Sequence, residues 1–106
     1  MKRVLFILLI TTPLIGFGQI DYIKEYYENG QLLKECEYKN NKKNGLWKFY
    51  YISGKLKKEV QYKDNKKEGV YKSFHENGKL EIVVNYKDGS REGLFKIFDE
   101  SGKLWR

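Results

Sequence analysis

Two residue types that often carry covalent or acid–base chemistry occur once each in this chain, as His75 and Cys36. A histidine can serve as a general base or a metal ligand and a cysteine as a nucleophile, but each needs partner groups nearby. A lone cysteine provides neither a disulfide framework nor a thiolate metal cluster. The carboxylates Glu35 and Glu59 are predicted to face lysines across a strand pair, which suits surface pairing better than catalysis. We therefore predict no catalytic residues, no metal site, no cofactor and no enzymatic activity.

The residues that recur most regularly have a period of 24. They are the glycines Gly30, Gly54, Gly78 and Gly102, the glycines Gly45, Gly69 and Gly93, the leucines Leu32, Leu56, Leu80 and Leu104, and the tyrosines Tyr38, Tyr62 and Tyr86. A fixed period of this size indicates one supersecondary unit that is stacked several times. In this alignment His75 shares its position with Tyr51, and Cys36 shares its position with Val60. The repeat therefore favours a strand-edge role for His75 and a core role for Cys36.

Each unit holds two runs rich in aromatic and β-branched residues, separated by turn residues, which is typical of β-hairpins. The sequence predicts an all-β fold, a single-layer antiparallel meander of seven or eight strands built from 24-residue hairpins. A hairpin centred on Ser53-Gly54 would place Trp47 opposite Val60 and Tyr51 opposite Leu56. The second connection is expected to centre on residues 65–66. Asn29-Gly30 and Asn77-Gly78 suit two-residue turns in which both residues have positive φ.

This register places most of the large aromatic residues on one face of the sheet. A lone layer needs a partner for its apolar face, so the sheet must either curl over that face or use it for binding or self-association. The candidate binding residues on it are Trp47, Tyr62, Tyr71, Tyr86 and Phe95.

Residues 1–18 have the layout of a secretory signal peptide. Lys2 and Arg3 form a positive region, residues 4–10 are an unbroken apolar run, and small residues precede the expected cleavage between Gly18 and Gln19. Cleavage would make the protein periplasmic or secreted and leave one repeat domain, residues 19–106, with units at about 20–43, 44–67, 68–91 and 92–106. An uncleaved membrane anchor is the alternative, although the run is short for a span of roughly 20 residues.

The chain carries 21 basic and 14 acidic side chains, a net charge of +7. An excess of this size can attract nucleic acid or anionic lipid. Lysines and glutamates are mixed along the sequence, however, so we interpret the charge as solvation of an exposed sheet. This disfavours nucleic acid as a partner and leaves an anionic membrane surface and self-association open.

The repeat resembles the MORN-repeat variant of bacterial proteins, and within it the group often labelled YwqK-type antitoxins. The first half of the motif occurs as Tyr26-Tyr27-Glu28-Asn29-Gly30-Gln31-Leu32, Tyr50-Tyr51-Ile52-Ser53-Gly54-Lys55-Leu56 and Phe74-His75-Glu76-Asn77-Gly78-Lys79-Leu80. The second half spans Tyr38 to Trp47, Tyr62 to Tyr71 and Tyr86 to Phe95. The resemblance implies a β-hairpin solenoid that contacts proteins or membranes, with no catalytic residues to transfer. Choline-binding cell-wall repeats are a looser similarity, through residues 45–51.

We expect an exported, non-enzymatic repeat protein that binds a protein or a component of the cell envelope through its aromatic face. The alternative is an antitoxin-like protein that binds and neutralises a toxin partner, which requires that residues 1–18 are retained or are not a signal peptide. A third hypothesis is electrostatic binding of nucleic acid or anionic lipid by the lysines, which would weaken steeply with salt.

Overall fold

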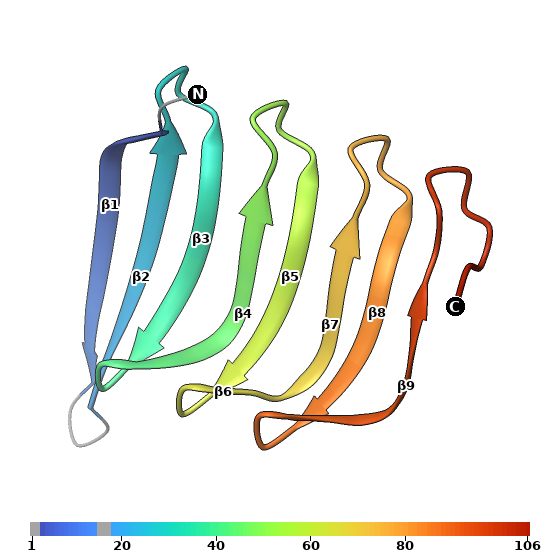
Figure 1. The fold of residues 1–106 in the computed structure, drawn as a ribbon. Helices are drawn as coiled ribbons and strands as arrows, with labels where there is room; N and C mark the ends of the chain where they lie inside the picture. The colour runs from blue at the N-terminus through green and yellow to red at the C-terminus, as the bar shows by residue number, and fades with distance from the viewer. Residues whose placement is uncertain (1–2, 15–17) are drawn as a thin grey trace.

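The computed structural model describes the backbone of residues 3–14 and 18–106 and the side chains of residues 19–106. These residues form one open antiparallel sheet in which, apart from one two-residue strand, strands that follow one another in the chain lie side by side (Figure 1). The prediction of an all-β, single-layer hairpin meander is confirmed. None of the described residues lies in a helix that could span a membrane.

The described part of the chain forms nine strands rather than the seven or eight expected. They are β1 (Arg3–Leu14), β2 (Gly18–Tyr27), β3 (Leu32–Lys39), β4 (Lys42–Tyr50), β5 (Leu56–Lys63), β6 (Lys66–Lys67), β7 (Gly69–Phe74), β8 (Leu80–Lys87) and β9 (Ser90–Ile97). The short β6 and β7 divide one predicted strand at Glu68, and both pair with β5. The predicted signal peptide lies partly outside the described residues. Its residues 3–14 pair with β2 as β1, and its removal stays a prediction.

The central part of each hairpin has the predicted register. Trp47 lies opposite Val60 and Lys48 opposite Glu59 between β4 and β5, and Ile23 lies opposite Cys36 between β2 and β3. Close to the turn the prediction is wrong, because Tyr50 rather than Tyr51 pairs with Leu56. The register shift that moves this pair lies between Phe49 and Tyr50.

The turns at the two ends of the sheet are of different kinds. At the upper end in Figure 1, Gly54 has a φ of 99° and its N–H donates to the Tyr51 carbonyl oxygen at 2.9 Å. The Tyr51 N–H donates to the Lys55 carbonyl oxygen at 2.8 Å, which closes a three-residue loop. Such a loop needs positive φ only at its glycine. The two-residue turns predicted at Asn29-Gly30 and Asn77-Gly78 are therefore wrong, since the equivalent glycines have the same geometry.

The two-residue turns lie at the lower end instead. Both central residues have positive φ at Asn40–Asn41, Asp64–Asn65 and Asp88–Gly89, which is the pattern of a type I′ turn. The second connection thus centres one residue earlier than predicted. The register around β5 then shifts by two residues between the pair Tyr62–Lys67 and the pair Glu59–Lys72. A shift of two keeps every side chain on its predicted face, because side chains alternate with a period of two.

The sheet is one layer thick, with principal extents of 48 × 37 × 16 Å. Its most buried apolar side chains, which still expose 3 to 7% of their surface, are Leu33, Cys36, Trp47, Val60 and Val84. We use "aromatic face" for the side of the sheet that carries Trp47, Val60, Tyr62, Tyr71, Val84, Tyr86 and Phe95. On the opposite face, one position of each repeat is apolar and exposed, as Tyr22, Leu46, Val70 and Leu94.

Candidate binding surface on the aromatic face

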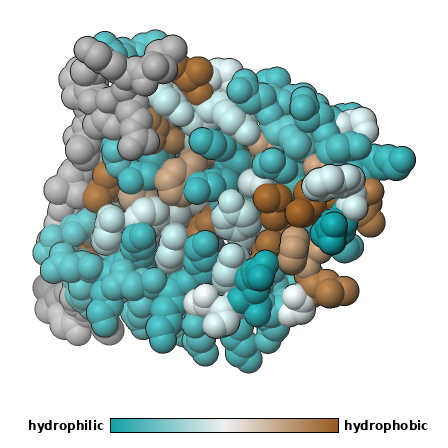
Figure 2. Space-filling view, viewed as in Figure 1, coloured by the Kyte–Doolittle hydropathy of each residue, from teal (hydrophilic) through white to brown (hydrophobic). Residues whose placement is uncertain are grey.

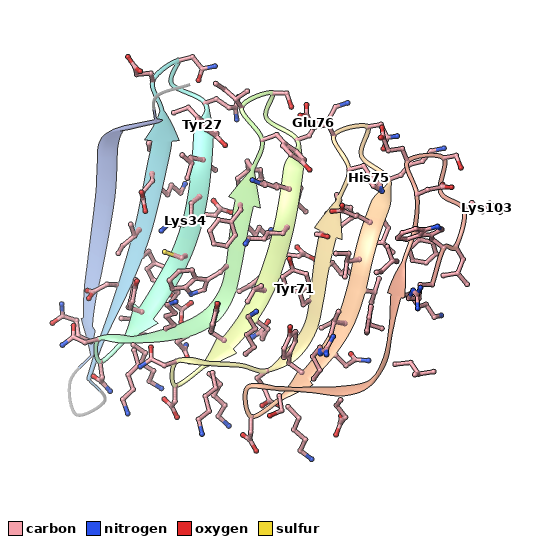
Figure 3. All side chains as sticks on the ribbon, viewed as in Figure 1. Tyr27, Lys34, Tyr71, His75, Glu76 and Lys103 are labelled. Atoms are coloured by element: carbon pink, nitrogen blue, oxygen red, sulfur yellow. The ribbon has the colours of Figure 1, made fainter. Side chains whose placement is uncertain are left out.

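Aromatic rings meet across neighbouring strands of the aromatic face. The ring centres of Trp47 on β4 and Tyr62 on β5 lie 5.2 Å apart, and those of Tyr71 on β7 and Tyr86 on β8 lie 6.4 Å apart. Cross-strand aromatic pairs of this kind stabilise a sheet. Figure 3 labels Tyr71 in the lower half of the sheet, toward the two-residue turns. The pleat therefore brings four of the five predicted binding residues together as two pairs.

Trp47 differs from the other candidate residues because it is buried. Only 4% of its surface is exposed, and its indole N–H donates to the Glu37 carbonyl oxygen at 3.0 Å. The ring of Tyr38 meets it edge-on at 5.2 Å. Trp47 thus holds β3, β4 and β5 together. The side chains that a partner can reach are the half-buried ones, namely Tyr62, Tyr71, Tyr86 and Phe95.

A row of cations covers these rings, and none of them was among the residues predicted to bind. The Lys43 ammonium lies 5.2 Å from the centre of the Trp47 ring and 5.1 Å from that of Tyr62. In the next repeat, the Lys67 ammonium lies 4.8 Å from the centre of the Tyr86 ring. The Arg91 guanidinium lies 5.1 Å from the centre of the Phe95 ring. We call Lys43, Lys67 and Arg91 the cation row. They are 24 residues apart, so the period that revealed the aromatic residues could also have revealed them.

The cation row belongs to a strongly basic edge of the sheet. We define the basic edge as residues 39–43, 63–67 and 87–91, which hold the three two-residue turns. It carries eight basic and two acidic side chains, a net charge of +6 out of +7 for the whole chain. In Figure 2 the lower margin of the molecule, where these turns lie, is largely hydrophilic. Charges that are mixed along the sequence are gathered here, because every second turn of a meander lies at the same edge.

An open hollow of about 590 Å³ lies between the second and third of these turns. It is lined by Lys43, Tyr62, Asn65, Lys66, Lys67, Tyr86, Gly89 and Arg91, so every charged side chain on its wall is a cation. The Asn65 side-chain oxygen accepts a 2.8 Å hydrogen bond from the Lys43 main-chain N–H. This bond leaves the Asn65 amide NH₂ group as a further donor. The hollow thus offers donors and positive charge, which suits an anionic group.

The two residues considered first for chemistry have structural roles. His75, labelled in Figure 3, places its Nε2 2.8 Å from the Phe98 carbonyl oxygen, so this nitrogen is the donor. Cys36 is 5% exposed, and its burial raises the pKa of the thiol, an effect that the nearby Lys34 charge reduces. A buried thiol with a raised pKa is a poor nucleophile. Within the described residues, no cluster of three histidine, cysteine or carboxylate side chains is placed to hold a metal ion.

A family of known proteins matches the repeats of this chain. No curated protein is significantly similar to the chain. The sequence profile described as "MORN repeat variant" matches four segments, residues 22–40, 43–64, 67–88 and 91–106, which together cover well over half of the chain. Proteins with this repeat are in general non-enzymatic repeat modules. The hairpin repeats of the structure agree with this match, and the chain belongs to the MORN repeat variant family.

Proposed function

We propose that the chain is an exported, non-enzymatic binding module that contacts a protein or a component of the cell envelope through its aromatic face. The observation that carries the proposal is the cation row over the half-buried rings, which recurs in three successive repeats. Aromatic residues and arginine are enriched in protein interfaces, where they supply contact area and directed hydrogen bonds. The layout of residues 1–18 supports export.

The surface is also better suited to binding than to catalysis. It is open and shallow, and the charged side chains that line its hollow are all cations, so the hollow offers no carboxylate as a general base. His75 is used for hydrogen bonding and Cys36 is buried in the packing of the sheet. A single-layer repeat sheet presents an extended area to a partner without the enclosed pocket that most small-molecule sites have.

Partner capture by matched variants tests the proposal. The full-length chain is immobilised and exposed to a cell-envelope fraction, and one variant carries Tyr71→Ala with Phe95→Ala. The control carries Leu46→Ala with Val70→Ala, which removes exposed side chains from the opposite face. Circular dichroism establishes that both variants keep the sheet. We expect the first variant to lose a captured component that the control retains. Capture that is equal in both variants contradicts the proposal.

An antitoxin-like protein that neutralises a toxin partner is the second candidate function. It is favoured by the sequence resemblance and by the pairing of residues 3–14 with β2, which a retained N-terminus would preserve. Cell fractionation with intact-mass measurement separates the two. A periplasmic or secreted species that begins at Gln19 supports the exported module. A cytosolic species that still carries residues 1–18 supports the antitoxin-like protein instead.

A further inference from the structure

The cation row is not neutralised within the described part of the sheet. The ion pair found among these residues joins Lys34 to Glu25 at 2.7 Å, and neither belongs to the basic edge. The two carboxylates of the basic edge, Asp64 and Asp88, line a separate hollow of about 310 Å³ with Lys63, Lys66 and Glu68. The Glu68 carboxylate accepts a hydrogen bond from the Asp88 N–H at 2.9 Å. The positive charge on the aromatic face is therefore available to a ligand.

The spacing of the cation row limits which anionic chain can lie along it. Each repeat contributes two strands, so equivalent residues of neighbouring repeats are separated by two inter-strand steps, about 9.4–9.8 Å. A polyproline II helix has three residues per turn, so the side chains on one side of it recur about every 9.3 Å. In a peptide in β conformation, side chains on the same side recur about every 6.7 Å. Such a peptide would fall out of register with the cation row after one repeat. The cation row thus matches an acidic peptide in polyproline II conformation.

The cations over the rings also argue against single-stranded nucleic acid. Proteins that bind single strands stack the bases on free aromatic faces. Here Lys67 lies 5.5 Å from the centre of the Tyr71 ring and 4.8 Å from that of Tyr86, so a base would have to displace it. A ligand that is recognised by its charges meets no such obstacle. The Arg91 guanidinium can in addition bind a carboxylate through two parallel hydrogen bonds.

We propose that the cation row binds an acidic peptide segment in polyproline II conformation, with a carboxylate side chain on every third residue. This inference rests on the proposed function and specifies the chemistry of the partner. The peptide lies across the strands, along the basic edge. Its successive carboxylates meet Lys43, Lys67 and Arg91, and one of them enters the hollow between the second and third turns. Its remaining residues cover the exposed parts of Tyr62 and Tyr86.

Two peptides of the same composition test the inference against the full-length chain. Both contain four glutamates and eight prolines, but one repeats Glu-Pro-Pro and the other has its glutamates at positions 1, 3, 5 and 7 with proline at every other position. Both are polyproline II helices of the same charge, and only the first aligns its carboxylates on one side. We expect the first peptide to bind about tenfold more tightly, since it alone meets three cations at once. Equal affinity for the two peptides overturns the inference.

Charge-matched variants locate the site. Lys67→Gln with Arg91→Gln removes two cations of the row, and Lys48→Gln with Lys72→Gln removes two from the opposite face at the same net charge. We expect the preference for the Glu-Pro-Pro peptide to vanish in the first variant and persist in the second. Loss of the preference in both variants, while both remain folded, overturns the assignment to this face.

Two further ligands distinguish the other anionic partners. If oligothymidylate or vesicles containing anionic lipid bind more tightly than the Glu-Pro-Pro peptide, the peptide inference is wrong. A failure of the peptide inference can also be told apart from a failure of the proposed function. Envelope capture that depends on Tyr71 and Phe95, without a preference between the two peptides, refutes the ligand class alone. Capture that is indifferent to these two residues refutes the binding face itself.

Discussion

The phenol of Tyr51 donates a 2.6 Å hydrogen bond to the main-chain carbonyl oxygen of Phe74, in the next repeat. The same link recurs one repeat earlier, where the Tyr27 phenol donates to the Tyr50 carbonyl oxygen at 2.7 Å. It recurs one repeat later, where His75 takes the place of tyrosine. The fourth position of the series is Asp99, whose carboxylate accepts hydrogen bonds from Ser101 in its own turn instead. A side-chain ladder thus connects successive hairpins near the three-residue loops.

Removing one link of this ladder should weaken the fold measurably. Tyr51→Phe keeps the ring but leaves the Phe74 carbonyl oxygen without its donor, and we expect a loss of about 1 kcal/mol in the free energy of unfolding. Tyr22→Phe is the matched control, since the Tyr22 side chain is 43% exposed. Urea unfolding followed by circular dichroism measures both. If the two variants are equally stable, the Tyr51 link does not contribute.

Alanine should be tolerated less well at Gly45 than at Gly78. Both glycines have positive φ, 74° and 91°, so alanine costs about 1–2 kcal/mol at either position. A Cβ at position 45 would also lie 2.9 Å from Oε1 of Glu37, whereas a Cβ at position 78 would meet no atom within 4 Å. The Glu37 carboxylate would have to move, which disturbs its 2.6 Å hydrogen bond from the Asn44 side chain.

We therefore expect Gly45→Ala to lower the free energy of unfolding by about 1 kcal/mol more than Gly78→Ala. Denaturant midpoints at a constant m value provide the comparison. Equal losses would mean that only the backbone conformation matters and that Glu37 moves without cost.

Tyr50 should make the fold sensitive to alkaline pH. Burial and then the Glu35 charge raise the pKa of its phenol from 10.0 to about 12, and its hydroxyl donates to Glu35 at 3.2 Å. The folded state therefore favours the neutral phenol. This contribution to stability is complete below pH 10 and is lost as the pH rises toward 12.

The free energy of unfolding of the unmodified chain should thus fall more steeply between pH 10 and 12 than that of Tyr50→Phe. The comparison is needed because burial also raises the pKa of Tyr51 and Tyr71, which titrate in both proteins. Urea unfolding at a series of pH values, with tyrosinate absorbance as a second readout, checks the difference. Parallel pH profiles would show that Tyr50 has no special role.

The two tryptophans should differ sharply in their importance for folding. Trp47 is 4% exposed and Trp105 is 74% exposed. Trp47→Ala removes a buried ring and leaves the Glu37 carbonyl oxygen without its indole donor, so we expect a loss of about 3–5 kcal/mol. Trp105→Ala should change the free energy of unfolding by less than about 0.5 kcal/mol. Similar losses in urea unfolding would contradict the burial of Trp47.

The sequence by itself determined the repeat and the two faces of the sheet. The 24-residue period and the alternation of side chains are local properties, and they place Trp47 opposite Val60 without any knowledge of the tertiary structure. They also survive the error at the second connection. The second connection centres on Asp64–Asn65 and the register shifts by two residues, yet no side chain changes face. The matching sequence profile depends on the same recurring residues.

Only the tertiary structure decided which residues are accessible and where the charge lies. Trp47, Tyr71 and Phe95 share one repeat position, but Trp47 alone is buried. The Tyr38 and Tyr62 rings both lie 5.2 Å from its ring, whereas the Tyr86 ring lies 6.4 Å from that of Tyr71. Lysine pairs that are 24 residues apart look scattered in the sequence. The meander folds each connection back to the same edge and so concentrates a net charge of +6 there. The period shows which residues are equivalent, but the clustering depends on how closely turns that are remote in sequence lie to one another in space.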